Sequence, residues 1–162
     1  MSASGSFGVN YDRVYATTDA LGLPAVLMDR GSDKAGEFMF VKAGAAIAQY
    51  AWVGIDGEGD ALELTTTTYA SSAAIGVAQV AMASGEYAWV FVGKGGGTGV
   101  GIKALFSANY AAFAVVNTTA TAGVADDSAT KILGGVVGLT LVGVAQAEAE
   151  IMASGLITKV TA

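Results

Sequence analysis

Hydrophobic and polar residues alternate with a period of two along much of the chain, which is the pattern of β-strands. The alternation is clearest over residues 86–92, where an aromatic face is predicted opposite a face of smaller apolar side chains. The aromatic face carries Tyr87, Trp89 and Phe91, and the other face carries Ala88, Val90 and Val92. Residues 37–42 repeat the pattern, with Phe38 and Phe40 on one predicted face. Both segments therefore predict strands.

Short apolar runs predict further strands. They cover residues 47–55, 61–68, 101–106, 110–116 and 132–145. Residues 56–60 read Asp-Gly-Glu-Gly-Asp, a composition that is typical of a turn. For residues 73–82 the alanines allow a helix, but Ile75, Gly76 and Val77 favour a buried strand.

Residues 145–153 are compatible with a strand or with a short helix that ends at Gly155 as its C-cap. The fold class that these patterns predict is all-β, with one or two short helices at most. The strands are expected to form a compact body of the sandwich or barrel type.

A duplicated phrase indicates that this body contains two related β units. Gly-Val-Ala-Gln followed by Met-Ala-Ser-Gly occurs twice, and an apolar segment follows each copy. The copies lie at residues 76–79 with 82–85, and at residues 143–146 with 152–155. We infer units of about 36–95 and 99–162, joined by the glycine-rich run 93–99 as a flexible loop.

Residues 1–35 differ from this body because their apolar residues follow no clear period. They contain the single proline, Pro24, and a charged run at residues 29–34. We interpret them as an extended N-terminal arm that packs along another surface, with a frayed terminus as the alternative. The candidate interface residues are those of the arm, Tyr11, Tyr15, Leu21 and Leu23, and those of the aromatic face, Tyr87, Trp89 and Phe91. Interior packing is the alternative for the aromatic face.

Composition narrows the classes of function. The 162 residues include no His and no Cys, while 53% are hydrophobic and only 14% are charged. The chain therefore lacks the commonest general base, the commonest metal ligand and any thiolate or disulfide chemistry. We expect no enzymatic activity, no metal and no cofactor.

Charge and hydropathy bear on the partners. The net charge is −6 and the eight basic residues are scattered, which disfavours a nucleic-acid partner. Residues 64–85 and 104–125 are uncharged and long enough to span a membrane, but they are rich in Thr, Ser, Gly and Ala. We therefore interpret them as sheet and expect no membrane partner.

Three motifs have the composition of ligand sites but lack essential positions. In the glycine-rich run 93–101, Lys94 comes too early for a phosphate-binding loop. The acidic turn 56–60 lacks the glycine and the glutamate that an EF-hand loop requires. Glu148 and Glu150 would point the same way on a strand, but no partner acid accompanies them.

Several segments, taken in order, resemble the decoration or cement proteins of tailed-bacteriophage heads. They are Phe-Val-Lys-Ala-Gly-Ala-Ala-Ile at 40–47, Val-Gly-Ile at 53–55, Ala-Ile-Gly-Val-Ala at 74–78, Ser-Gly-Glu-Tyr-Ala-Trp-Val at 84–90, Asn-Thr-Thr-Ala-Thr-Ala-Gly at 117–123, Asp-Asp-Ser-Ala-Thr at 126–130 and Ile-Leu-Gly-Gly-Val at 132–136. The resemblance implies a compact, usually trimeric protein on the outer surface of the capsid, which stabilises the shell by bridging major capsid subunits.

The partners implied are thus the major capsid protein and further copies of the chain, with the virion as the location. The alternatives are a phage tail or fibre component, a secreted adhesive β-module and, third, a small-ligand-binding barrel.

Overall fold

The computed structural model describes residues 9–16, 22–128 and 131–160. Strands make up 48% of the chain and helix only 3%, which confirms the predicted all-β class. The strands are β1 (Val14–Tyr15), β2 (Arg30–Asp33), β3 (Gly36–Ala43), β4 (Trp52–Ile55), β5 (Asp60–Glu63), β6 (Ala74–Ala78), β7 (Tyr87–Gly96), β8 (Lys103–Phe106), β9 (Val116–Thr118), β10 (Ala125–Asp126), β11 (Ile132–Gly138) and β12 (Ala147–Lys159). One short helix, α2 (Thr68–Ser71), is present in the described residues. No helix in those residues is long and apolar enough to cross a membrane.

The strands β3 to β7 close into a five-stranded barrel. Neighbours pair in the order β3, β5, β4, β6, β7 and back to β3, and only the β3–β5 pair is parallel. All five strands contribute alternate residues to one apolar cluster, which fills the interior as in other small barrels. Met39 and Val41 belong to this cluster, whereas Phe38 and Phe40 point outward, so the two predicted faces of β3 are confirmed.

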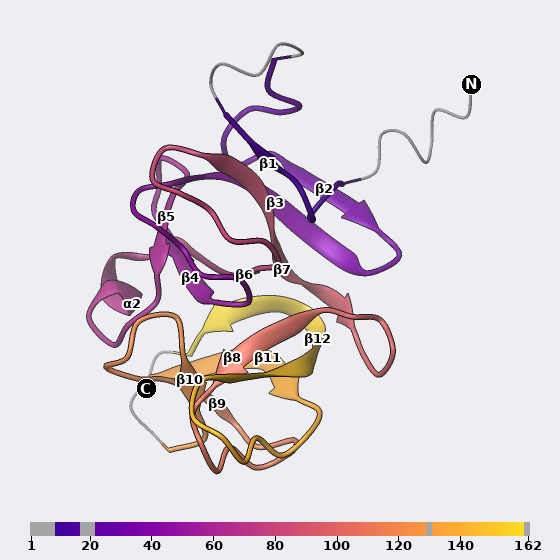
Figure 1. Cartoon of the computed structure of the whole chain (residues 1–162), viewed down its shortest axis with the longest axis vertical. Coiled ribbons are helices and arrows are strands. Elements are labelled where there is room, and N and C mark those ends of the chain that lie inside the picture. The colour runs from indigo at the N-terminus through magenta and orange to yellow at the C-terminus, as the bar shows by residue number, and fades with distance from the viewer. Residues whose placement is uncertain (1–8, 17–21, 129–130, 161–162) are drawn as a thin grey trace.

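The strands β8 to β12 close into a second barrel with the same pairing. Here the order is β8, β10, β9, β11, β12 and back to β8, and again only the first pair, β8–β10, is parallel. Each strand of the first barrel thus has a counterpart in the second, β3 in β8 through to β7 in β12. Figure 1 shows the two barrels one below the other along the long axis.

Each barrel contains two chain reversals, which we call corners, with the same backbone course. In each corner, the residue four positions after the end of the strand forms an isolated bridge to the corresponding residue of the other corner in the same barrel. Ile47 pairs with Met82 in the first barrel, and Tyr110 pairs with Val142 in the second. A residue with positive φ follows three or four positions later. These residues are Tyr50, Gly85, Phe113 and Gln146, with φ of 65°, 86°, 61° and 56°. The repeated corners support the correspondence between the barrels residue by residue.

The corners also explain where the predicted strands are wrong. The segments 47–55 and 110–116 begin as turns, because Tyr50 and Phe113 adopt left-handed backbone conformations that interrupt an extended chain. The predicted strand 132–145 ends at Gly138 for the same reason, since a corner follows. The predicted strand 61–68 stops at Glu63.

Two ambiguous segments are resolved as strands. Residues 74–78 form β6, as favoured, and the helix alternative for residues 145–153 is wrong because β12 pairs with both β8 and β11. The predicted loop 93–99 is wrong in its first half, since β7 continues to Gly96 and crosses β12. A side chain at Gly93 would collide with the Gly155 carbonyl and one at Gly96 with the Ile151 carbonyl, so these glycines permit the close approach to β12.

The duplicated phrase does not mark equivalent positions. Gly76–Ala78 lies in β6, whereas Gly143–Gln146 lies in a corner, and the second Met-Ala-Ser-Gly lies inside β12. The two barrels, β3–β7 and β8–β12, span residues 36–96 and 103–159, and the connection between them runs from Gly97 to Ile102.

The described part of the N-terminal segment lies along the outer face of the first barrel. β1 pairs with β7, and β2 pairs with β3. The Tyr11 ring stacks on Phe38 with 4.7 Å between centroids, and Tyr15 is buried. One continuous apolar cluster extends from Tyr15 through this outer face into the second barrel.

Candidate interaction surface

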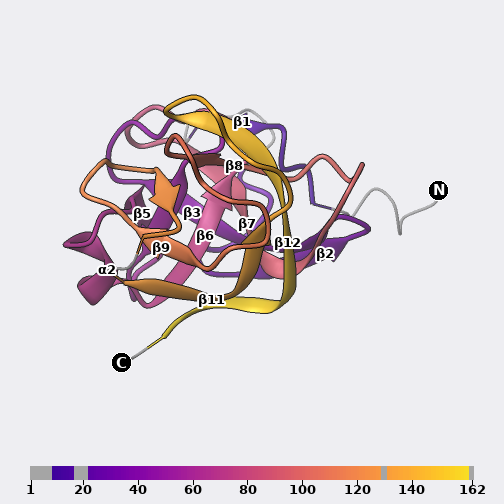
Figure 2. The same cartoon turned by 90° about the horizontal axis from the view of Figure 1, so that it is seen from below.

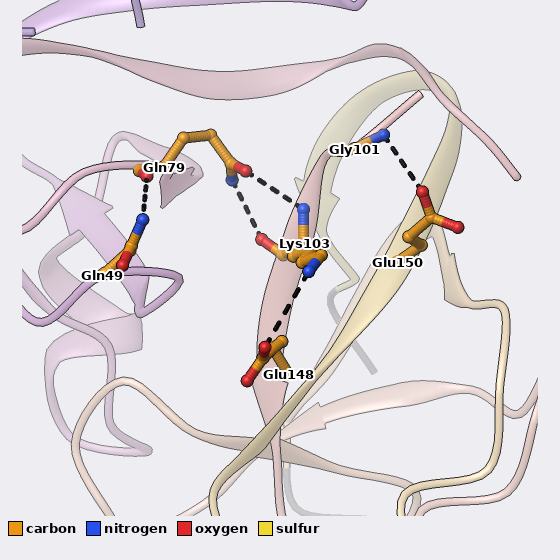
Figure 3. Close-up of polar contacts among 6 residues, drawn as sticks. All are labelled: Gln49, Gln79, Gly101, Lys103, Glu148 and Glu150. Atoms are coloured by element: carbon orange, nitrogen blue, oxygen red, sulfur yellow. Dashed lines mark hydrogen bonds and ion pairs between the residues drawn. The ribbon is translucent and has the colours of Figure 1, made fainter. Parts of the chain in front are cut away.

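A buried glutamine joins the two barrels. The Gln79 amide donates to the Lys103 carbonyl (2.9 Å) and accepts from the Lys103 N–H (3.0 Å), so it pairs with β8 as a neighbouring strand would. The Gln49 amide in turn donates to the Gln79 carbonyl at 3.1 Å (Figure 3). This arrangement fixes the first barrel against the first strand of the second.

The carboxylates that the sequence singled out lie beside this junction. Glu148 and Glu150 are both on β12 and point to the same side, as expected on a strand (Figure 3). Glu148 lies 3.8 Å from the Lys103 ammonium, and Glu150 accepts hydrogen bonds from the Gly99 and Gly101 N–H groups. Both carboxylates therefore satisfy donors of the chain itself.

A corner of the first barrel forms another part of the junction. The Tyr50 carbonyl accepts a hydrogen bond from the Leu105 N–H (2.9 Å), and the Trp52 N–H donates to the Gly123 carbonyl (3.0 Å). The Trp52 indole N–H also donates to the Leu105 carbonyl at 3.0 Å. Trp52 is fully buried as a result, and its ring meets Phe106 edge-on.

The short helix α2 adds a second connection. It places the Tyr69 hydroxyl within hydrogen-bonding distance of the Ile132 and Val160 carbonyls, at 3.0 and 3.2 Å. The first barrel is thus covered along β4, β6 and β7 by elements of the second.

The corresponding face of the second barrel is open to solvent. A groove of about 430 Å³ lies there, and we call it the corner groove. Its lining residues are Phe113, Val115, residues 132–137, Met152 and Ser154. Phe113, Val115 and Met152 are 65%, 53% and 44% exposed. Figure 2 shows β11 and β12 at this end of the molecule.

The strand pairing and corners relate the corner groove to the junction. Phe113 and Val115 occupy the corner positions of Tyr50 and Trp52, and Met152 occupies the position of Phe91. Trp52 and Phe91 are fully buried, whereas their counterparts are exposed. The two barrels thus present the same surface in two states, one covered by protein and one uncovered.

A buried tyrosine holds the corner that forms one wall of the groove. The Tyr110 hydroxyl donates to the Ala114 carbonyl (2.7 Å) and accepts from the Gly138 N–H (2.9 Å). Burial raises the pKa of Tyr110 above its ordinary value. The corner is therefore fixed to β11 by a neutral phenol.

The interface residues predicted from sequence lie elsewhere. Phe91 and Trp89 are buried beneath the N-terminal segment, and Tyr87 packs beside Phe40. Tyr11 and Tyr15 cover this aromatic face. Leu23 is exposed, and Leu21 lies outside the described residues. In the described residues these aromatic side chains contact one another within the chain.

The sequence pattern does not predict the corner groove, because it places Phe113 and Val115 in a regular strand over residues 110–116. The available signal was the common corner spacing, which relates Phe113 to Tyr50. Acidic residues do not gather into a possible metal site: in the part of the chain that the structure describes, no group of three or more such ligands occurs.

Comparisons of the chain with family models, with curated proteins and with solved structures found no match.

Proposed function

We propose that this protein is a structural virion protein, a decoration protein that binds the outer surface of a phage head. It stabilises the shell by bridging neighbouring major capsid subunits and catalyses no reaction. The observation that carries the proposal is the corner groove, an apolar surface open to solvent. Exposed apolar grooves of this kind are typical of protein–protein contact sites.

The charge of the chain supports an outer location. The net charge is −6, and a surface of this sign is repelled by the phosphate backbone of packaged DNA. The segments that resemble decoration proteins include residues 40–47 and 84–90, which form the ends of β3 and β7 and their corners. They therefore belong to the framework of the first barrel rather than to a loop.

Decoration stabilises by linkage. A protein that binds the assembled lattice more tightly than free capsid subunits shifts the assembly equilibrium toward the lattice. Two closed barrels with a shared junction suit this role, because little conformational freedom remains to be lost on binding.

The test is the copy number of the protein in purified virions. Quantitative mass spectrometry is expected to give a number of the same order as that of the major capsid protein. Purified protein added to undecorated heads is expected to co-sediment with them and to raise their dissociation temperature. A handful of copies per virion identifies a tail or fibre component instead, and absence from virions overturns the proposal.

We also expect a closed symmetric oligomer on the shell, the trimer being the state that the resemblance implies. Closed symmetry prevents open-ended polymerisation of a chain with an apolar surface. Light scattering of the free protein and cryo-microscopy of decorated heads measure this directly. A monomer in both settings contradicts the expectation.

A further inference from the structure

We propose that the corner groove binds an extended apolar strand of a different protein, which pairs with the corner at Phe113 and Val115. The identity of that protein rests on the proposed function, under which it is the major capsid protein. The inference comes from the first barrel, where the equivalent surface is covered and its partner is visible.

Backbone hydrogen bonds to the second barrel cover a corner of the first. The Tyr50 carbonyl and the Trp52 N–H, which flank one corner residue, bond to the Leu105 N–H and the Gly123 carbonyl. Their counterparts are the Phe113 carbonyl and the Val115 N–H. Within the described residues these two groups have no hydrogen-bond partner. Unpaired backbone groups beside an apolar surface are a template for an added strand.

The side chains that line the groove are mostly apolar. All of them are uncharged, and Ser154 is the single hydroxyl among them. The β11 backbone bulges between Gly134 and Val136, and Gly134 and Gly135 line the groove with backbone alone. Met152 is an adaptable side chain that packs against irregular apolar shapes. The groove therefore fits a strand with apolar side chains at alternate positions and no charge facing inward.

The strands by which a second copy would fit the groove are already engaged. In the first barrel the covering elements are β8, the segment at Gly123 and β12, which pairs with β7, and the counterpart of β8 is β3. The outer face of β3 is covered by Tyr11 and its flank by β2. β8 itself is engaged with Tyr50, Trp52 and Gln79 of its own chain. β3 and β8 are therefore engaged within each copy, and this favours a strand of a different protein as the occupant.

The N-terminal segment thereby acts as a cap. It closes the surface by which one chain would add to the corner groove of the next, and it leaves the groove free for another partner. Capping of one end is how stacked repeat proteins avoid open-ended association.

The test compares two exposed valines. Val115→Asp places a charge in the groove, and Val26→Asp places the same charge on the N-terminal segment, where Val26 is exposed. Both variants are expected to keep the wild-type melting temperature. Val115→Asp is expected to weaken binding to undecorated heads by about tenfold or more, as for a central interface residue. Val26→Asp is expected to change it less than twofold.

Amide hydrogen exchange supplies a second measurement. Binding to heads is expected to slow the exchange of the Val115 N–H, because an added strand would accept its hydrogen bond. Equal binding of Val115→Asp and wild type overturns the groove as the site while the proposed function stands. Failure of the wild type to bind heads overturns the proposed function and, with it, the capsid strand. Loss of self-association in Val115→Asp, with binding to heads intact, assigns the groove to a second copy and also overturns the inference.

Discussion

The two barrels follow the same path but differ in what covers their outer faces. In the first, β3 and β7 pair Phe40 with Trp89, and these rings lie 5.2 Å apart under the N-terminal segment. In the second, the same positions of β8 and β12 pair Lys103 with Glu150. The pairing is the same in the two halves, but two aromatic residues are replaced by two charged ones.

The interior positions diverge far less than the outer ones. Val41 pairs with Ala88 in the first barrel, and Ala104 pairs with Ala149 at the corresponding place in the second. All four are buried apolar residues. Closure of a small barrel therefore constrains the inward-facing residues, which alternate along each strand. The outward-facing residues can differ according to the element that covers them.

The largest expected difference is between Phe91 and Met152, which hold the same position in the two barrels. Phe91→Ala is expected to lower the free energy of unfolding by about 3–5 kcal/mol, because a fully buried ring leaves a cavity. Met152→Ala is expected to cost less than about 1 kcal/mol, since this side chain is partly exposed. Urea unfolding of both variants measures the difference. Equal costs contradict the assignment of one face as covered and the other as open.

The second test uses the two glutamines of the duplicated phrase. Gln79→Ala is expected to cost about 1–3 kcal/mol, because the N–H and carbonyl of Lys103 lose their partners at the junction. Gln146→Ala is the matched control, since Gln146 is exposed in a corner, and its expected cost is within about 0.5 kcal/mol. Chemical unfolding again provides the measurement. If both changes cost the same, the side-chain pairing of Gln79 with β8 contributes nothing to stability.

A third test addresses the corner that forms the wall of the groove. Tyr110→Phe is expected to cost about 1–3 kcal/mol, because the buried Gly138 N–H loses its acceptor. The control is Tyr50→Phe, which gives the first barrel the residue that its counterpart Phe113 already has. Tyr50→Phe is expected to change the free energy of unfolding by no more than about 0.5 kcal/mol.

The Tyr110→Phe variant is also expected to differ from the wild type at alkaline pH. The raised pKa of Tyr110 means that its contribution is complete below the ordinary tyrosine value of 10.0 and is lost as the pH rises through the folded-state pKa. Stability of Tyr110→Phe is therefore expected to fall less steeply above pH 10 than that of the wild type. Parallel alkaline profiles would show that the phenol is not held neutral by burial.

The smallest expected effect is an acid one in the second barrel. Burial opposes ionisation of Asp126, but hydrogen bonding outweighs it, including that from the Asp127 N–H and the Ser128 hydroxyl, so the pKa is lowered below 3.8. Its contribution is present above that ordinary value and is lost as the pH falls through the folded-state pKa. The counterpart in the first barrel is Leu62, which cannot titrate. Asp126→Asn is expected to flatten the acid branch of the stability profile, and an unchanged acid branch argues against the contribution.

The regular strands could be predicted from the sequence with their faces. In β3 and β7 every second residue is large and apolar, and both sides are buried, so alternation alone orients Phe40, Val41 and Trp89. The corners could not be predicted, because Tyr50 and Phe113 adopt positive φ without being glycine, asparagine or aspartate. Their conformation is imposed by the closing hydrogen bonds across each barrel.

The glycine-rich segment and the corner groove were obscured for related reasons. Glycines are typical of a loop, yet here Gly93 and Gly96 allow β7 to approach β12 closely. The exposure of Val115 depends on which barrel surface another element covers, and no local pattern encodes that. The duplicated phrase was misleading because small residues fit a strand in one context and a corner in the other.

The position of β12 as the closing strand of the second barrel has a consequence for synthesis. The first barrel has all five strands once Gly96 has left the ribosome, but β8, β9 and β11 must wait for residues 147–159. During that interval the unclosed half exposes strand edges and interior residues such as Tyr110 and Phe106. Nascent chains that end between Gly96 and residue 147 are therefore expected to depend most on chaperones. In such chains the first barrel is folded, and the second is unclosed and prone to aggregation.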